Sequence, residues 1–305
     1  MSFQRFTLKN IGINILLVIV YLLWNSAIGE VKAEHYMLAF FWLSSYYAHE
    51  KSRKFITGFS IFFIYLIIYD SMRFMPNYQV SQVHIQDVYE AEKAWFGIMS
   101  NDVLLTPNEY LALHLNRLFD FLSGFFYINW LPVPIAFAIY LYFKDKFLYT
   151  QYALVFLFVN IFGFIMYYIF PAAPPWYVAL HGFEFDLNVL GDEAGLGRFD
   201  EIIGIPLFEN MYNKNANVFA AIPSLHAAYP TVAFLFGIKK GMGKVNWLFG
   251  TLMIGIWVSA VYSNHHYIID IALGAGVALF TFLLFNKIVE QPMIGKKMKK
   301  FIEYI

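Results

Sequence analysis

The sequence predicts an all-α integral membrane protein with about eight transmembrane helices. Hydrophobic residues make up 60% of its 305 residues and charged residues only 14%, a balance that is unusual for a soluble protein. Apolar runs near the roughly 20 residues that a bilayer requires recur along the chain. We expect helices near residues 11–29, 34–49, 55–75, 121–143, 149–170, 219–238, 247–263 and 267–286. The second contains two histidines, so the sequence leaves open whether residues 34–49 span the membrane fully.

The distribution of Lys and Arg predicts the topology. With the amino terminus in the cytoplasm, 15 of the 21 Lys and Arg residues fall in cytoplasmic segments, as the positive-inside rule requires. Both chain termini are then cytoplasmic. This topology also places His226 and His266 together on the extracytoplasmic side, although charge alone selected it.

The chain is expected to form one polytopic membrane domain. Residues 1–75 hold the N-terminal helices, residues 76–120 interfacial helices, residues 121–288 the catalytic core, and residues 289–305 a cytoplasmic tail. The first long connection, residues 76–120, predicts two surface helices. Apolar residues at helical spacing indicate the first of them, and a capping box at Thr106–Glu109 begins the second, which is expected to carry Arg117 and Asp120. The pair either shields the bundle or acts as a lid or lipid guide.

The second long connection, residues 171–218, is rich in proline and glycine. The helix before it should end near Phe170, because the residue before a proline avoids the helical conformation. Structureless connections of this length are usually functional or disordered, and the abundance of aromatic residues favours function here.

Composition excludes several classes of function. The absence of cysteine rules out disulfides, thiolate metal sites and a cysteine nucleophile. A formal net charge of zero and the absence of an extended basic tract give no sign of nucleic-acid binding. We expect the site to work without a metal or another cofactor.

His266 and Asp270 form the most informative pair in the chain. Residues four apart share one face of a helix, so the carboxylate can fix the imidazole tautomer and stabilise its cation. The other ring nitrogen is then free to act as a nucleophile or base. Ser263 or Asn264 is available to cap this helix, so the histidine is not needed as the cap. The alternative is a structural ion pair, which is costly at membrane depth unless it is used.

His226 begins another apolar stretch, in the motif Pro223-Ser224-Leu225-His226. Pro223 suits the start of a helix, and Pro230 should bend the helix because it cannot bond the carbonyl of residue 226. A polar residue at such a helix start in a membrane protein is a functional candidate. The alternative is a hydrogen bond to a loop carbonyl.

Arg198 is the candidate phosphate ligand. It is one of two cations in a connection with seven acids, and a guanidinium matches the geometry of a phosphate. The alternative is a salt bridge to Asp200 or another acid of the connection. His265 points to a different helix face from His266, where a structural role and substrate contact are equally compatible with the sequence.

Several motifs resemble known membrane enzymes. The segments 223–226 and 266–270 resemble two signatures of the type 2 phosphatidic acid phosphatase superfamily. The segments 170–177, 195–200 and 217–226 are similar to the fungal inositol phosphorylceramide synthases, the targets of aureobasidin. The resemblance covers roughly residues 160–275. It implies a six-helix phosphatase-like core with His226, His266 and Asp270 as catalytic residues. The substrate contacts expected on the same motifs are Arg198, Ser224, His265, Asp200 and Trp176.

The departures from the phosphatase pattern concern cations. Phosphatases carry basic residues before the histidine motifs, whereas here Phe170 precedes Pro171 and no basic residue lies between Lys146 and Arg198. The third phosphatase motif begins Ser-Arg, and here it reads Ser259-Ala260. A phosphate monoester carries close to two negative charges and benefits from several cations, so a phosphodiester suits this site better.

The resemblance implies transfer of phosphoinositol from phosphatidylinositol to ceramide through a phosphohistidine-type intermediate. Because the charge distribution places both histidines on the extracytoplasmic side, the site is expected to face a bacterial periplasm or, in a eukaryote, the Golgi lumen. The alternative within the superfamily is a lipid phosphatase acting on phosphatidate or a polyprenyl phosphate. A non-catalytic transporter or scramblase is the remaining alternative.

Overall fold

The computed structural model describes residues 6–213 and 217–305, so Arg5 and Lys214, two cations of the charge count, lie outside it. The all-α fold class is confirmed, with one small hairpin as the sheet structure of the described residues. The helices are α1 (Leu8–Ile28), α2 (Ala33–Ala48), α3 (Glu50–Gly58), α4 (Ser60–Met72), α5 (Gln86–Phe96), α6 (Pro107–Ala112), α7 (Arg117–Tyr127), α8 (Pro132–Lys144), α9 (Lys146–Ile169), α10 (Pro175–His181), α11 (Gly197–Ile203), α12 (Leu207–Tyr212), α13 (Leu225–Lys240), α14 (Val245–Tyr262), α15 (Ile268–Ile288) and α16 (Pro292–Tyr304).

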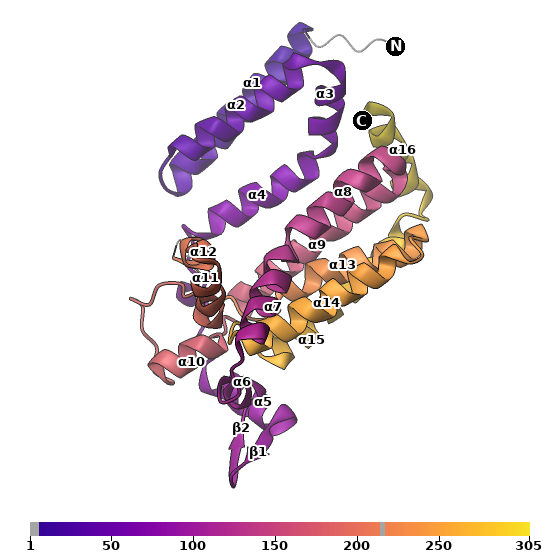
Figure 1. Ribbon diagram of the computed structural model, residues 1–305. Helices are drawn as coiled ribbons and strands as arrows, with labels where there is room; N and C mark the ends of the chain where they lie inside the picture. The colour runs from indigo at the N-terminus through magenta and orange to yellow at the C-terminus, as the bar shows by residue number, and fades with distance from the viewer. Residues whose placement is uncertain (1–5, 214–216) are drawn as a thin grey trace. The chain divides into compact units, whose positions relative to one another are not determined.

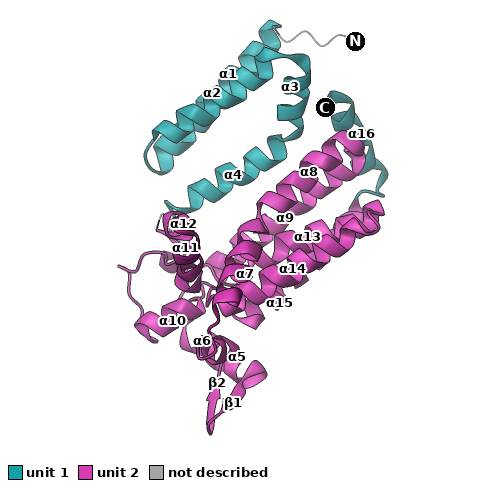
Figure 2. Cartoon of the chain, viewed as in Figure 1, with its two compact units in different colours: residues 1–75, 289–305 teal, residues 76–288 magenta. Residues whose placement is uncertain are grey.

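The chain divides into two compact units, shown in Figure 2. Unit 1 contains residues 1–75 and 289–305, and unit 2 contains residues 76–288. Within unit 1, indole N–H groups join the helices: Trp42 donates to Asn14 Oδ1 and Trp24 to Ser71 Oγ, each at 2.8 Å.

The single helix expected over residues 55–75 is instead two helices, α3 and α4, bent by 51°. Gly58 and Ser60 flank the break at Phe59, and small residues of these types are where helices kink. Helix α3 also begins earlier than expected, because the His49 side chain accepts a hydrogen bond from the Lys51 N–H and caps it.

Five segments of the described residues are long and apolar enough to cross a membrane, or six if the bent pair is one span. They are Leu8–Ile28, Arg117–Lys144, Lys146–Ile169, Val245–Tyr262 and Ile268–Ile288. By this measure, the described residues contain fewer candidate spans than the eight or so that were expected. Helices α2 and α13 have 16 residues each and fall short of the usual length of a span.

The membrane helices of unit 2 run side by side in a bundle of α8, α9, α13, α14 and α15 (Figure 1). Short 3₁₀ turns join some elements, with Ile128–Trp130 between α7 and α8. Helix α13 starts at Leu225, later than the expected residue 219, because Ser224 caps it by accepting from the Ala227 N–H at 3.2 Å.

The first connection contains helices α5 and α6, as expected, and a hairpin that was not expected. Strands β1 (Ile98–Ser100) and β2 (Val103–Leu105) pair around Asn101 and Asp102, which both have positive φ. The capping box of α6 is confirmed, since Thr106 and Glu109 each accept from the other's N–H. The helix ends at Ala112, however, and Arg117 and Asp120 lie on α7, which Asn116 caps.

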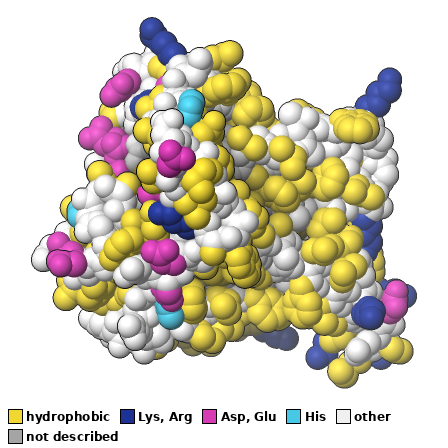
Figure 3. Space-filling model, turned by 90° about the horizontal axis from the view of Figure 1, so that it is seen from below, with side chains coloured by type: hydrophobic (Ala, Val, Ile, Leu, Met, Phe, Trp, Pro, Cys, Tyr) yellow, Lys and Arg dark blue, Asp and Glu magenta, His cyan; other side chains and the backbone are white. Residues whose placement is uncertain are grey.

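The second connection is largely ordered. Helix α9 ends at Ile169, as the proline that follows it requires, and α10, α11 and α12 follow in the connection. Hydrophobic, acidic and basic side chains are all exposed on the face of the molecule seen in Figure 3.

Close packing between α13 and α15 rests on Gly274. A Cβ built on Gly274 would lie 2.1 Å from the Ser224 carbonyl oxygen, so a side chain there forces the two helices apart. A Cβ on Gly276, two residues later, meets nothing within 4 Å.

We therefore expect Gly274→Ala to destabilise the protein by about 1–3 kcal/mol, the usual cost of overpacking, and Gly276→Ala to have little effect. Thermal unfolding of both variants in the same detergent measures the difference. Equal melting temperatures would show that the contact between Gly274 and Ser224 does not constrain the helices.

Candidate active site

His266 and Asp270 contact each other as their spacing predicts. His266 Nδ1 lies 3.2 Å from Asp270 Oδ2, and the same oxygen accepts from the Tyr267 N–H at 2.9 Å. Helix α15 begins only at Ile268, so His266 lies in the turn before the helix and not in its first turn. Asn264, with φ of 65°, reverses the chain there. Both side chains are buried, with Asp270 completely inaccessible to solvent.

His226 comes from the first turn of α13 and points at the same turn. Its Nδ1 lies 3.1 Å from Nε2 of His266, although 40 residues separate them. Trp130 and Tyr127 pack against the His226 ring, with centroids 4.5 and 5.1 Å away. The structure thus joins the three expected catalytic side chains by consecutive contacts, from Asp270 to His266 to His226.

The carboxylate sets the proton positions in this series of contacts. Facing Asp270, the Nδ1 atom of a neutral His266 carries the ring proton, which leaves a lone pair on Nε2. The His226 Nδ1–H then donates to Nε2. Burial lowers the pKa of His266, and this favours the neutral ring that a nucleophile requires.

Ser224 organises the site through its backbone and its cap. Its N–H donates to the Asp270 carbonyl at 2.9 Å, and its hydroxyl caps the helix that carries His226. This single residue therefore joins the starts of α13 and α15, and its side chain is fully buried in that role.

His265 is held by protein groups. Its Nε2 lies 2.9 Å from the Glu193 carbonyl oxygen, and its ring stacks on Tyr212 and Tyr127 with centroids 4.5 and 5.4 Å away. The sequence left a structural role and a substrate contact equally open, and these contacts favour the structural role.

Arg198 pairs with an acid that the sequence did not indicate. Its Nε donates to Asp120 Oδ1 of α7 at 2.5 Å, and its guanidinium lies over the Tyr262 ring at 5.4 Å. The Tyr262 hydroxyl donates to the same oxygen of Asp120 at 3.0 Å. Arg198 Nη2 has no hydrogen-bond partner among the described residues. The Gly195 N–H donates to the Ser263 carbonyl, which keeps the start of α11 beside the turn that carries His266. This turn, residues 261–269, is called the histidine turn below.

Two further expected substrate contacts have other roles in the structure. Asp200 Oδ2 accepts from the N–H groups of Phe208 and Glu209, at 2.7 and 3.1 Å, and so caps α12. Trp176 packs its indole into a buried apolar cluster with Ile85 and Phe219, and its backbone N–H donates to the Asn264 carbonyl. Both stabilise the surroundings of the histidine turn, and the structure provides no support for substrate contact by either.

Two residues that the sequence did not indicate hold the histidine turn. Asn108 of α6 donates to the carbonyls of Val261 and His266, both at 3.0 Å, and Glu92 of α5 accepts from the N–H groups of Ile268 and Ile269. The first N–H groups of α15 are therefore capped by Glu92, and not by Ser263 or Asn264 as the sequence suggested. A glutamate on the apolar face of an amphipathic helix was the available signal.

A cavity of about 1020 Å³ lies along α14 in the apolar part of unit 2. Its lining comes mainly from α7 and α14, including Phe126, Gly250 and Val258. It runs from Trp247 near one end of α14 to Tyr262 at the other. Tyr262 is also the residue that contacts Arg198 and Asp120.

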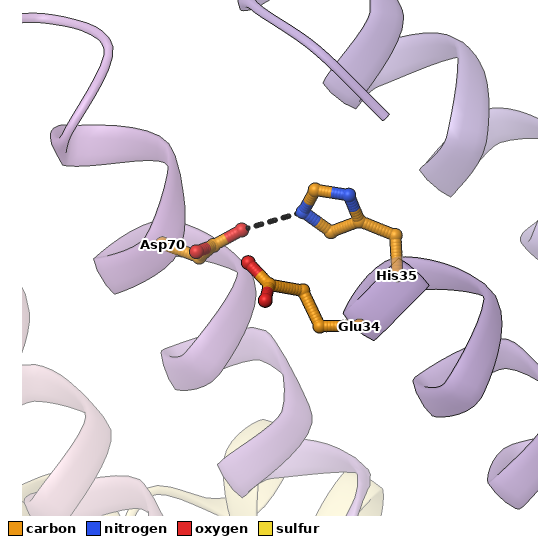
Figure 4. Close-up of side chains that lie close together, drawn as sticks. All are labelled: Glu34, His35 and Asp70. Atoms are coloured by element: carbon orange, nitrogen blue, oxygen red, sulfur yellow. Dashed lines mark hydrogen bonds and ion pairs between the residues drawn. The ribbon is translucent and has the colours of Figure 1, made fainter. Parts of the chain in front are cut away.

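A separate polar cluster in unit 1 consists of Glu34, His35 and Asp70 (Figure 4). Three ligand-type atoms of this cluster lie within 4.8 Å of one another. Arg73 already pairs with both carboxylates, at 2.7 and 2.6 Å. His35 uses both ring nitrogens, one toward Asp70 and one as acceptor from the Lys32 N–H. We assign the cluster to the joining of α2 to α4.

Comparison with known proteins identifies the family. The family described as the PAP2 superfamily matches residues 102–284. The phosphoinositol dihydroceramide synthase of Bacteroides thetaiotaomicron is 48% identical over 277 residues, which cover 89% of this chain and 90% of that protein. The inositol phosphorylceramide synthase catalytic subunit AUR1 of Saccharomyces cerevisiae is 32% identical over 46% of this chain and 35% of its own length. No solved structure matches the chain.

The long match to the superfamily and the full-length bacterial relative agree with the motifs and with the apolar helices. The chain therefore belongs to the PAP2 superfamily of multi-pass membrane proteins, within the family that contains the inositol phosphorylceramide synthases.

Proposed function

We propose that the chain is a sphingolipid synthase that transfers phosphoinositol from phosphatidylinositol to ceramide and releases diacylglycerol. The observation that carries the proposal is the series of contacts from Asp270 through His266 to His226, which provides a nucleophile and an acid–base group beside each other. The relatives named as phosphoinositol dihydroceramide synthase and inositol phosphorylceramide synthase support a transferase acting on sphingolipids.

The first step uses His266 as the nucleophile. Its Nε2 lone pair attacks the phosphorus of phosphatidylinositol, and the bond from phosphorus to the diacylglycerol oxygen breaks. A protonated His226 gives its Nδ1 proton to that oxygen, so that diacylglycerol leaves as a neutral alcohol. The bound phosphate favours the protonated form of His226 because it places a negative charge beside the ring.

The hydrogen bond between the two histidines defines the reaction axis. Nδ1 of His226 faces Nε2 of His266 at 3.1 Å, which leaves no room for a phosphate between them, so the rings must separate to admit it. A phosphate inserted between them has the nucleophile on one side and the proton donor on the other. In-line displacement requires this opposed arrangement of attacking and leaving groups.

The second step returns the site to its starting state. His226, now neutral, takes the proton of the ceramide primary hydroxyl, and the ceramide oxygen attacks the phosphorus. The bond from phosphorus to His266 Nε2 breaks, which gives inositol phosphorylceramide and the free imidazole. Asp270 stabilises the positive charge on the His266 ring while the intermediate lasts.

The distribution of Lys and Arg supports an extracytoplasmic site. Most of these residues fall in the segments expected to be cytoplasmic, and in the same topology the starts of α13 and α15 are extracytoplasmic. The site would then face the periplasm in a bacterium or the Golgi lumen in a eukaryote.

The proposal is tested with the purified protein, phosphatidylinositol carrying labelled inositol, and ceramide or dihydroceramide, followed by thin-layer chromatography. We expect labelled inositol phosphorylceramide from the wild type. His266→Ala should lower turnover by roughly 1000-fold or more, because it removes the nucleophile. Asp270→Asn should cost somewhat less, because the nucleophile survives in a poorly oriented tautomer.

Release of inorganic phosphate from phosphatidate without an acceptor lipid would identify a lipid phosphatase in place of the synthase. Turnover by His266→Ala close to that of the wild type would reject the covalent route. Circular dichroism of each variant checks that the helices have formed.

We also propose that Arg198 binds the phosphate through Nη2 while Asp120 holds Nε. A guanidinium beside the equatorial oxygens stabilises the transition state more than the ground state. Arg198→Ala should therefore lower kcat by roughly 100-fold with a smaller change in KM, and Arg198→Lys should recover only part of it.

Asp200→Ala is the matched control for the Arg198 variants, since it removes the cap of α12 but no positive charge. A drop in melting temperature with modest loss of kcat is expected there. Equal losses of kcat and stability at Arg198→Ala and Asp200→Ala would show that Arg198 only shapes the connection.

The cavity along α14 is proposed to hold the hydrocarbon of a lipid substrate. Its walls are apolar, it lies in a membrane span, and its Tyr262 end adjoins Arg198, where a lipid phosphate would be bound. The isobutyl group of Gly250→Leu would occupy part of this space.

We expect Gly250→Leu to lower kcat/KM for long-chain substrates several-fold more than for short-chain ones, as a filled pocket does. Long-chain and short-chain ceramides are compared with one phosphatidylinositol, and long-chain and short-chain phosphatidylinositols are compared with one ceramide. The two comparisons identify which lipid uses the cavity. Gly276→Leu is the control, because open space surrounds that glycine. Unchanged chain-length selectivity in both comparisons would mean that bulk lipid fills the cavity.

A further inference from the structure

The histidine turn is held from outside the membrane bundle. It joins the end of α14 to the start of α15, over residues 261–269, and carries His266. Asn108 bridges it by donating to Val261 and His266 carbonyls at 3.0 Å each. The turn is therefore held by a side chain of the first connection.

Glu92 makes the contacts at the start of α15. Its Oε1 accepts from the Ile268 N–H at 2.9 Å, and its Oε2 accepts from the Ile269 N–H at 3.1 Å. The first N–H groups of a helix have no partner within the helix, so these two need an outside acceptor. Asp270 already serves the Tyr267 N–H with its own carboxylate.

The burial of Glu92 has no other explanation in helix α5. Glu92 is completely inaccessible to solvent, and only Val88 among the other residues of the helix is buried. Burial raises the pKa of the Glu92 carboxyl, and the two N–H groups oppose that cost. Burying a carboxyl group costs free energy, and the contacts of Glu92 with the start of α15, 176 residues away along the chain, explain why it is buried.

We infer that Glu92 is a positioning residue for the reaction: it fixes the first turn of α15 and thereby keeps Asp270 in hydrogen-bond contact with His266. Asp270 lies one residue beyond the pair of N–H groups that Glu92 accepts from. If that turn loosens, Asp270 Oδ2 leaves Nδ1 of His266 and the tautomer is no longer fixed. This inference rests on the proposed function, in which His266 acts through Nε2.

The test compares Glu92→Gln with Glu90→Gln in the full-length protein. Glutamine replaces one carboxylate oxygen with an NH₂ group, which cannot accept from an N–H group, whereas Glu90 is an exposed glutamate on the same helix. We expect Glu92→Gln to lower kcat about tenfold to a hundredfold, with KM for phosphatidylinositol within about twofold of wild type. Glu90→Gln should match the wild type. Glu92→Asp, which keeps both oxygens at a shorter reach, should retain more activity than Glu92→Gln.

Hydrogen–deuterium exchange of the peptide over residues 261–270 provides a readout that does not depend on activity. Faster exchange in that peptide alone, in Glu92→Gln and not in Glu90→Gln, supports the inference. Wild-type exchange and kcat in Glu92→Gln would overturn it, and so would faster exchange throughout unit 2 with kcat and melting temperature falling together. If Glu92→Gln yields no folded protein, the same criteria apply to Glu92→Asp. Absence of product from the wild type would reject the proposed function, and the exchange result would still decide whether Glu92 holds the turn.

Discussion

The arrangement of this site depends on one buried carboxylate at the start of α15. Asp270 has no exposed surface, and a single oxygen accepts from both the Tyr267 N–H and the His266 ring. A charge in that position is tolerated because the helix start supplies N–H groups and a favourable dipole. The carboxylate in turn fixes which nitrogen of His266 keeps its lone pair. In the proposed mechanism, that lone pair is the one that faces His226 and attacks the phosphorus.

The surroundings of Asp270 explain why so much of the chain outside the membrane bundle is ordered. Ser224, Trp176 and Gly195 each donate a backbone N–H to residues 263–270, and they come from the start of α13 and from the second connection. Asn108 and Glu92 add side-chain contacts from the first connection. The sequence left two roles open for the first connection, a shield or a lid. Its hydrogen bonds to the turn show that it is at least part of the scaffold of the site.

Much of the site was predictable from the sequence because its key spacing is local. His266 and Asp270 are four residues apart, and Ser224 precedes His226 at a recognisable helix start, so short-range rules were sufficient. The partners of Arg198 and of α15 were not predictable, because Asp120 and Glu92 lie 78 and 176 residues away along the chain. The hairpin at Asn101 was missed although its turn residues suit positive φ. The break at Phe59 was missed because a single glycine is a weak signal against a long apolar run.

The charges around Arg198 bear on the choice between transfer and hydrolysis. Arg198 is paired with Asp120, so the proposed phosphate would meet an ion pair whose Nη2 has no partner among the described residues. That environment suits the single charge of a phosphodiester better than the two charges of a phosphate monoester. In the proposed mechanism, the burial of His266 and Asp270 limits the access of water to the intermediate on the ring. We therefore expect an acceptor hydroxyl delivered from the bilayer to be favoured over water, which suits the proposed transfer of a headgroup between two lipids.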